Sequence, residues 1–208
     1  MTRLAMAVLV ALHAGTWVCA DDWPMFGRDR THNAVSPEKK APVDWQNDVR
    51  DEKGVLVHKA RNIAWTAELG SLSLGGPVIS DGLVWVGTNN GHPRDLTFTD
   101  PKRLHPITKK PLPIDMGVLM CFRERDGKFL WQYASPRLAT TLSEDWPHSA
   151  MGGAPLVEGD RLWFMTNRCE VVALDIGPLK RGDGVPKELW KVDMRKEFDV
   201  FQTRARVG

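Results

Sequence analysis

The sequence predicts an all-β protein made of repeated four-stranded antiparallel units, and three observations lead to this fold class. A segment that starts at Gly75 recurs, without gaps, from Gly153. Each copy contains short runs of β-branched and aromatic residues between Asp-Gly or Gly-Asp turns, a pattern typical of hairpins. The compact copy, residues 153–192, matches the ~40–45 residues of one propeller blade. We therefore predict a β-propeller of which this chain supplies about two blades.

The repeat is the strongest of these observations. Glycine, proline, tryptophan, threonine and asparagine stand at matched places in 75–89 and 153–167, and the apolar positions match as well. The second half of the first copy, 118–133, corresponds in the same way to 170–192. Each copy thus predicts four antiparallel strands in sequence order, as in a sandwich or a propeller. Internal repetition favours the propeller.

The chain divides into parts on either side of this repeat. A further strand is expected over 62–69, and Trp23, Phe26 and Trp45 are expected to pack onto a larger body. The parts follow in this order: a signal peptide (1–20), an irregular lead segment (21–61), a blade region (62–194) with blades at 75–133 and 153–192, and the truncated start of a next blade (195–208).

Residues 1–20 have the order of a secretory signal peptide. Arg3 gives a positive start, Leu4–Leu12 is an apolar core, and Ala20 is a small residue before Asp21. The alternatives are a membrane anchor or a buried helix, but the apolar run is shorter than the ~20 residues that span a bilayer. A lipoprotein signal ending at Cys19 is a further alternative. We expect an exported protein, periplasmic or extracellular, with no membrane span.

Composition narrows the classes of function. The chain has 208 residues, of which 42% are hydrophobic and 26% charged, as in a soluble globular protein. Its 28 Lys and Arg residues are balanced by 26 Asp and Glu residues, without a long run of one sign. A nucleic-acid surface would show clustered basic residues, so we expect no nucleic-acid partner.

Two cysteines remain after the predicted cleavage, Cys121 and Cys169. An oxidising compartment permits a disulfide between them. Both fall in predicted buried strands, and we expect two free thiols.

One segment resembles a known motif. From Cys121 to Trp131 the chain resembles the tryptophan-docking motif of the pyrroloquinoline-quinone-type (PQQ-type) propeller repeat, with Gly127 and Trp131 at the matching places. Cys121, Arg123 and Asp126 replace the family's small residue, Asp and Thr. The later copy keeps Ala173, Asp175 and Trp190, and Trp65 holds the equivalent closing position of the preceding strand. The resemblance implies that these residues dock one blade on the next: Trp65, Gly127, Trp131, Ala173, Asp175 and Trp190.

The lead segment adds to this resemblance. Residues 23–27 and 33–36 look like the opening of secreted members of the quinoprotein-like family. Quinoprotein dehydrogenases of this superfamily hold PQQ between a tryptophan and two adjacent cysteines, with calcium beside a catalytic aspartate. This chain has no adjacent cysteines. The resemblance therefore carries over the repeat without the active site, and we expect no catalytic residue, metal ligand or cofactor here.

Two functions from different classes follow. The first is an exported, non-enzymatic propeller scaffold that binds a protein, peptide or polysaccharide, similar to the outer-membrane barrel-assembly propeller. The alternative is a fragment of a PQQ-dependent alcohol or sugar dehydrogenase, with PQQ and calcium as cofactors. Phosphate-loop, zinc-protease and serine-hydrolase motifs are absent from the sequence.

The most individual feature is a long insertion in the first copy, residues 91–116. A long structureless insertion in a compact domain is usually functional or disordered. We expect it at the propeller rim, where a protein or glycan ligand could bind, or else as a solvated variable loop. The candidate rim-binding residues are His92, Arg94, Asp95 and His105. A third metal ligand with suitable spacing is lacking.

Two further expectations concern what surrounds the blades. Asp145 to His148 repeats the pattern of Asp22 to Pro24, which favours aromatic packing beside a proline turn over a rim contact. A propeller closes with typically 4–8 blades, so about two would leave sheet faces exposed. We expect the rest of a propeller to be required, with this sequence as its N-terminal part. A non-functional product is the remaining possibility.

Overall fold

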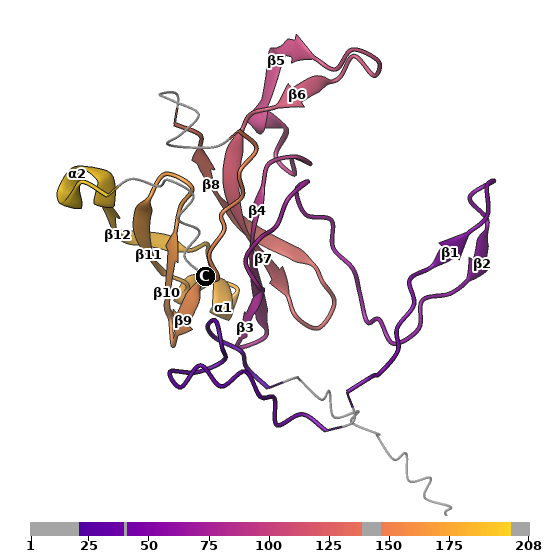
Figure 1. The fold of residues 1–208 in the computed structure, drawn as a ribbon, viewed down its shortest axis with the longest axis horizontal. Helices are drawn as coiled ribbons and strands as arrows, with labels where there is room; N and C mark the ends of the chain where they lie inside the picture. Colours follow the sequence, from indigo (N-terminus) through magenta and orange to yellow (C-terminus); the bar gives the residue numbers. More distant parts are fainter. Residues whose placement is uncertain (1–20, 40, 139–146, 201–208) are drawn as a thin grey trace, which may run out of the picture.

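The computed structural model describes residues 21–39, 41–138 and 147–200. The predicted signal peptide, Asp145, Trp146 and the predicted tail from 201 to 208 lie outside the described residues. Figure 1 shows two sheets side by side, with the lead segment running below them and a hairpin rising at the far end of one sheet.

Blade 1 is a four-stranded antiparallel sheet in the order β3-β4-β7-β8. Its strands are β3 (Val78–Ser80), β4 (Leu83–Asn89), β7 (Met116–Arg123) and β8 (Phe129–Pro136). The first turn uses Asp81 and Gly82, with φ of 51° and 74°, the positive values that tight hairpin turns demand. The predicted hairpins therefore form where the turn residues indicated.

Blade 2 repeats this order, from the inner strand to the outer strand, as β9-β10-β11-β12. Its strands are β9 (Leu156–Glu158), β10 (Arg161–Met165), β11 (Glu170–Asp175) and β12 (Lys187–Asp193). A short helix, α1 (Gly177–Arg181), occupies its long last turn. Two successive four-stranded antiparallel sheets confirm the predicted fold class, an all-β chain with about two propeller blades.

The region after blade 2 begins with a helix. Helix α2 (Met194–Phe198) follows β12 directly, with the Asp193 side chain accepting a hydrogen bond from the Arg195 amide at 3.2 Å. The sequence assigned the start of a next blade to residues 195–208, and in the described part, up to residue 200, this segment is helix and turn.

The insertion in blade 1 is ordered, which corrects the expectation of a structureless loop. It contains a 3₁₀ helix, η1 (Leu96–Phe98), followed by a hairpin of β5 (Thr99–Leu104) and β6 (Pro111–Pro113). The sequence signal was weak because β6 has two prolines, which cannot donate to a ladder and are confined to sheet edges. A two-stranded sheet has only edges, so the prolines are tolerated there.

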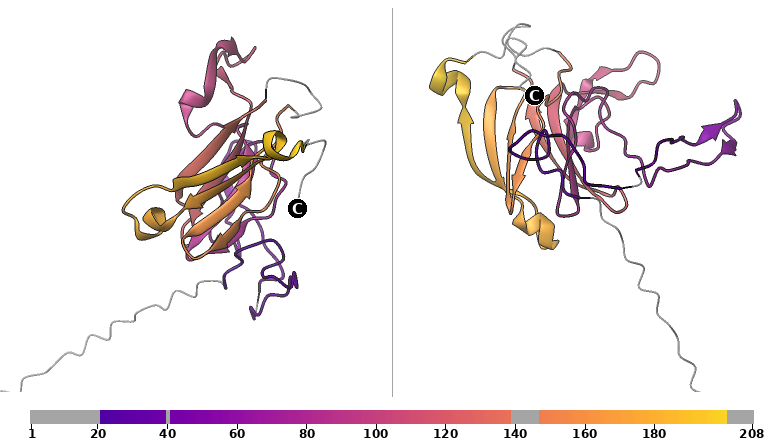
Figure 2. Two further views of the ribbon diagram at one scale, coloured as in Figure 1. Left: turned by 90° about the vertical axis from the view of Figure 1, so that its left-hand side faces the viewer. Right: turned by 60° about the horizontal axis from the view of Figure 1, so that its bottom comes forward.

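The lead segment also contains a hairpin, β1 (Val49–Arg50) with β2 (Leu56–His58). Figure 2 shows it extending away from both blades. Trp45, at its base, is 70% exposed and Phe26 is 59% exposed, so the expectation that both pack onto a larger body is wrong for the described structure. Of these three aromatic residues, only Trp23 pairs with a blade, through an isolated antiparallel bridge to Ile79.

Residues 62–69 form no strand, contrary to the expectation. Their alternating apolar side chains pack against one face of blade 1 and do not extend its hydrogen-bonded edge. Trp65, Ala67 and Leu69 lie on a buried cluster that includes Val84 and Phe122. The alternation therefore reflects a chain that covers a sheet, which has the same period of two as a strand within one.

The two blades share one hydrophobic core. Trp85 and Leu119 of blade 1 are buried together with Leu162 and Val172 of blade 2. Aromatic contacts cross the interface, where the rings of Tyr133 and Phe164 meet edge to face with centroids 5.0 Å apart. This face-to-face packing is how each sheet removes its apolar surface from water.

Polar contacts join the first turns of the two blades. Lys180 of α1 places its Nζ 2.7 Å from Asp81 of blade 1 and 3.0 Å from Asp160 of blade 2. The lead segment crosses the same end of the molecule, where the Val157 amide donates to the Pro24 carbonyl at 2.8 Å. The inner strands of both blades are therefore held at one relative position.

Trp65 docks on blade 1 through the turn that the motif resemblance indicated. Its indole N–H donates to the Glu124 carbonyl at 2.5 Å, and its ring stacks against Phe122 with centroids 6.4 Å apart. A Cβ added to Gly127 would lie 2.5 Å from the Trp65 ring, closer than real Cβ contacts come. Glycine at 127 is therefore required both for φ of 68° and for this close approach.

The two free cysteines occupy different settings. Cys121 is fully buried in β7, and burial raises the pKa of its thiol above the ordinary value. Cys169 lies in the tight turn before β11 with φ of 62°, and not in a strand as expected. Burial also raises its thiol pKa, which makes both groups poor nucleophiles.

The docking turn gives a first prediction. Gly127→Ala should lower the free energy of unfolding by at least about 1 kcal/mol more than Gly82→Ala. Gly82 has a similar φ of 74° but open space where a Cβ would go, so it controls for backbone strain. Urea unfolding of the two variants measures the difference, and equal losses would show that Trp65 does not press on Gly127.

A second prediction concerns pH. The hydrogen bond from Arg123, at 2.9 Å, lowers the pKa of Asp126 to about 2. Because the folded pKa lies below the ordinary value, this pair stabilises the fold above about pH 4, and that contribution is lost as the pH falls towards about 2. Thermal unfolding between about pH 5 and about pH 2 should therefore show a larger drop for the unmodified protein than for Asp126→Asn. Parallel curves would contradict a role for this pair.

Candidate functional site

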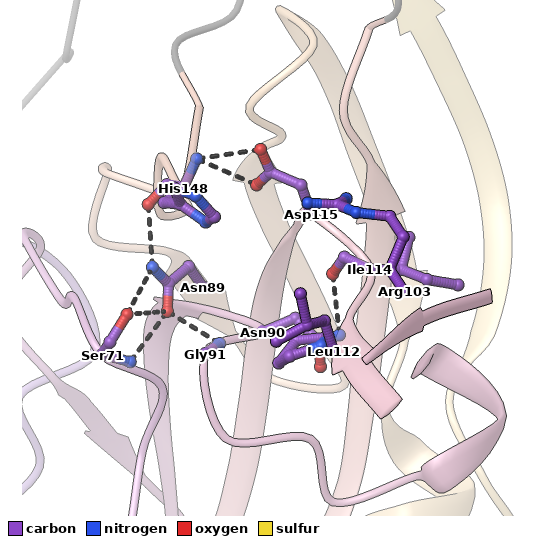
Figure 3. Close-up of a pocket in the computed structure, with 10 residues that line it drawn as sticks. Ser71, Asn89, Asn90, Gly91, Arg103, Leu112, Ile114, Asp115 and His148 are labelled. Carbon is purple, nitrogen blue, oxygen red and sulfur yellow. Dashed lines mark hydrogen bonds between the residues drawn. The ribbon is translucent and has the colours of Figure 1, made fainter. Parts of the chain in front are cut away.

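The candidate site is a pocket of about 230 Å³ where the insertion meets the ends of β4 and β7. Figure 3 shows side chains converging on it from these elements and from the segment that leads into blade 2. The lining residues are Ser71, Asn89, Asn90, Gly91, Arg103, Leu112, Pro113, Ile114, Asp115 and His148.

Asn89, the last residue of β4, holds the pocket floor together. Its Oδ1 accepts from the Ser71 amide at 2.8 Å and the Gly91 amide at 3.0 Å, while its Nδ2 donates to the His148 carbonyl at 2.8 Å. Three segments far apart in sequence therefore meet on one side chain that is only 2% exposed (Figure 3). Thr88 adds a bond of 2.8 Å from its hydroxyl to the Leu72 carbonyl.

Asn90 fixes the root of the insertion in the same way. Its Nδ2 donates to the carbonyls of Phe98 and Ile114, both at 2.9 Å. The Ile114 amide donates in turn to the Phe98 carbonyl, also at 2.9 Å. Because buried amides with satisfied hydrogen bonds rigidify a structure, the β5–β6 hairpin starts from a defined position over the pocket.

The carboxylate of Asp115, which lines the pocket, already has a hydrogen-bond donor and a cation beside it within the protein. Both oxygens of Asp115 accept from the His148 amide, at 3.0 and 2.9 Å, and Arg137 places its Nε 3.8 Å away. His148 has φ of 58°, a left-handed conformation that this bond supports. Asp115 therefore positions the segment that enters blade 2, and its charge is balanced by a neighbouring cation.

The groups left for a ligand are the Arg103 cation, an imidazole and apolar side chains. In the part of the chain that the structure describes, neither the Arg103 guanidinium nor the His148 imidazole forms a hydrogen bond or ion pair within the protein. Opposite them, Leu112, Pro113 and Ile114 give an apolar wall. This arrangement suits a carboxylate carried beside an apolar group, since Arg binds carboxylates through charge-assisted hydrogen bonds.

The four predicted rim residues lie outside the pocket and support the fold locally. His92 places its Nδ1 3.1 Å from the Leu69 carbonyl, and Arg94 donates to the Glu68 carbonyl at 2.5 Å. Asp95 caps η1 by accepting from the Thr97 amide at 2.9 Å, and His105 accepts from the Ile107 amide at 3.2 Å within its own turn.

Arg94 also packs against two aromatic rings of blade 1. Its guanidinium carbon lies 5.3 Å from the ring centroid of Phe122 and 4.8 Å from that of Phe129, so it covers two aromatic faces. Together with its bond to Glu68, this attaches the segment 62–69 to blade 1.

Sequence reasoning missed the residues that form the pocket. Arg103 stood in the predicted insertion without a role, and Asp115 carried no signal. Asn89 did carry one, since it recurs as Asn167 in the repeat, and His148 belonged to a pattern with a rim contact as its weaker interpretation. The distance in sequence between Asn89 and His148 concealed their contact.

The remaining predicted docking residues lie in blade 2 and in the interface. Ala173 stands between Trp163 and Trp190 in register, and Trp131 is packed on the shared core. Asp175 accepts from the Gly177 amide at 2.9 Å and starts the turn that contains α1.

Two observations concern metal ions and membranes. Across 21–39, 41–138 and 147–200, three or more His, Cys, Asp or Glu side chains nowhere gather as a metal site would need. No helix in those ranges has both the length and the apolar character to cross a membrane.

Comparisons with known proteins give a resemblance at the level of structure. No family model and no curated protein matches the sequence. Among solved structures the chain is similar to quinohemoprotein alcohol dehydrogenase from Comamonas testosteroni, with 16% identity and a TM-score of 0.34. The match covers 82% of this chain and 27% of that protein, so this chain spans about a quarter of its length. The fold class, an all-β chain with about two propeller blades, rests on the strand order and the repeat.

The pocket gives a third prediction. Asn89→Ala should lower the free energy of unfolding by about 2–3 kcal/mol, because buried donors and acceptors lose their partner. Asn33→Ala, at an exposed asparagine, should change it by less than about 0.5 kcal/mol. Denaturant unfolding of both variants provides the measurement, and equal stabilities would contradict the role of Asn89 at the pocket floor.

Proposed function

We propose that this chain belongs to an exported propeller with PQQ-like repeats that binds a peptide and does not itself catalyse a reaction. The ligand's carboxylate pairs with Arg103 at the rim pocket, and its neighbouring apolar side chain lies on Leu112 and Ile114. The observation that carries this proposal is the pairing of an uncompensated guanidinium with an apolar wall on a rigid floor. Export is proposed from the pattern of residues 1–20.

A peptide is favoured over an acidic sugar by the nature of that wall. Sugar rings are commonly bound on the faces of Trp, Tyr or Phe, and the lining residues include none of these three. Aliphatic side chains and proline instead suit an aliphatic side chain next to a carboxylate.

The dehydrogenase alternative is supported less well by the residues present. PQQ with calcium would need adjacent cysteines and acidic ligands for the metal. The sequence has no adjacent cysteines, and the described residues offer no cluster of three such ligands. These residues do not fit the cofactor, and we derive no step through it. Dye-linked alcohol oxidation by the protein mixed with PQQ and calcium would favour this alternative.

Binding of short peptides by the full chain tests the proposal. Fluorescence anisotropy should show that peptides with an aliphatic C-terminal residue and a free carboxylate bind at least about 10-fold tighter than the same peptides amidated. Arg103→Gln should remove that preference. Lys102→Gln, the same charge change on the next residue of β5 and outside the pocket, should leave it within about 2-fold.

Three outcomes distinguish the possibilities. Loss of the preference in Arg103→Gln alone supports the proposal. Equal binding of acid and amide forms would contradict it. Competition by glucuronate but not by any peptide would assign the pocket to an acidic sugar instead.

A further inference from the structure

The β5–β6 hairpin projects from the body of the protein. Figure 1 shows it rising from the end of blade 1 with its turn at the free end, and neither of its strands pairs with a blade. Its base belongs to the rim pocket, through Arg103 and residues 112–114. Residues 104–110, which we call the hairpin tip, are not part of the pocket lining. The tip therefore has no part in the peptide binding proposed above.

Positive charge is concentrated on this hairpin. Residues 99–113 contain four Lys or Arg residues and a single acid, whereas the whole chain has a net charge of only +2. Lys102, Lys109 and Lys110 are exposed, and within the part of the chain that the structure describes they form no ion pair. The acid, Asp100, accepts from the Lys102 amide at 2.9 Å and so supports its own strand. The three lysine charges are therefore available to a partner.

The tip places aliphatic side chains among these cations. Ile107 is 84% exposed and Leu104 is 50% exposed. Hydrogen bonds close the turn that carries them, since the Lys109 amide donates to the His105 carbonyl at 3.0 Å and the His105 amide donates to the Lys110 carbonyl at 2.9 Å. The His105 ring adds a third bond, in which its Nδ1 accepts from the Ile107 amide at 3.2 Å. A defined turn thus holds Ile107 in solvent beside two lysines.

The other projecting hairpin, β1–β2, differs in its charge. Residues 44–61 contain four acids and four Lys or Arg residues. Two of these cations pair with acids of the same segment, Arg50 with Asp48 at 3.9 Å and Arg61 with Asp44 at 2.8 Å. Exposed apolar side chains on β1–β2 are therefore not accompanied by excess positive charge. The combination of an aliphatic tip with unpaired lysines belongs to β5–β6.

This combination fits the surface of an anionic membrane better than other anionic partners. Lysine side chains can lie along apolar surface while the ammonium stays in the headgroup region, and an aliphatic side chain between them enters the boundary with the acyl chains. A projecting tip reaches a planar bilayer without a cavity. Single-stranded nucleic acid is bound through aromatic side chains, and residues 99–113 contain no Phe, Trp or Tyr. An acidic polypeptide would account for the lysines but not for the exposed Ile107.

We infer that the hairpin tip binds the surface of a membrane that contains anionic lipid. Lys109 and Lys110 lie at the headgroups, and Ile107 enters the boundary between headgroups and acyl chains. The contact is peripheral and reversible, because one aliphatic side chain and a few cations supply far less binding energy than a spanning helix. It is also sensitive to salt, because the attraction of exposed charges is screened. The inference does not rest on the proposed peptide binding, since it uses residues outside the pocket lining.

Cosedimentation with lipid vesicles tests the inference. The protein is taken after export, so that the apolar residues 4–12 of the predicted signal peptide do not bind lipid themselves. Binding to phosphatidylcholine vesicles with about one third phosphatidylglycerol should be at least about 10-fold tighter than binding to phosphatidylcholine alone. Raising the salt from about 0.05 M to about 0.5 M should weaken it at least about 10-fold. Equal binding to both kinds of vesicle would overturn the inference.

Variants of the tip separate the two parts of the contact. Replacing both lysines, Lys109→Gln with Lys110→Gln, should weaken binding to the anionic vesicles at least about 10-fold, because each cation near such a surface contributes about 1 kcal/mol, or about 5-fold. Ile107→Ser should weaken it at least about 3-fold, and Ile107→Leu should leave it within about 2-fold.

Lys53→Gln with Lys59→Gln is the matched control, since it removes the same charge from exposed positions on and beside β1–β2. It should change vesicle binding by less than about 2-fold. Equal losses in the two double variants would mean that the vesicles respond to net charge alone, which would overturn the inference. All variants should keep the midpoint of thermal unfolding within about 1 °C, because the replaced side chains are exposed.

A soluble polyanion identifies the competing partner. Poly-glutamate should compete with the anionic vesicles only weakly, because it offers no apolar region to Ile107. Capture of the protein by poly-glutamate in preference to the vesicles, with Ile107→Ser unchanged, would assign the tip to an acidic polypeptide and overturn the inference. Arg103→Gln and the amidated peptides test the pocket separately, so failure of either proposal leaves the other standing.

Discussion

A sheet with two apolar faces is stable in water only when each face is covered, and this constraint explains the arrangement of the chain. In blade 1 the face that carries Val84 and Phe122 is covered by residues 62–69, and the face that carries Trp85 is covered by blade 2. Burial of apolar surface is the dominant favourable term in folding. The lead segment therefore acts as a cover, which explains why it lies across the sheet instead of pairing along its edge.

The rim pocket is a consequence of the same construction. Each copy of the repeat has Thr-Asn where its second strand ends: Thr88 and Asn89 close β4, and Thr166 and Asn167 follow directly after β10. In blade 1 this pair binds the segments that lead into the two blades, through Ser71 and His148. Covering the faces brings these crossing segments together, and the buried asparagine fixes them. The pocket floor is thus made from residues whose first role is structural.

The sequence was most informative where structure is local and repeated. The turns at Asp81–Gly82 and Gly159–Asp160 and the strands around them were predicted, because turn chemistry and alternation are readable over a few residues. The motif resemblance also named Trp65 and Gly127 as docking residues, without pairing the two. Contacts between distant segments were not readable. The bonds of Asp115 to His148 depend on how two loops cross, and the coil at 62–69 has the same alternation as a strand.

The insertion explains how the rim pocket of blade 1 is formed. In blade 2 the second and third strands are joined by a tight turn, in which the Cys169 amide donates to the Thr166 carbonyl at 3.1 Å. In blade 1 that turn is replaced by η1 and the β5–β6 hairpin, which carry Arg103 and the apolar wall above the shared floor. His92 and Arg94, two of the predicted rim residues, anchor this addition to the segment 62–69. The repeat therefore supplies the frame, and a single insertion adds the cation and the apolar surface that distinguish one rim position from the next.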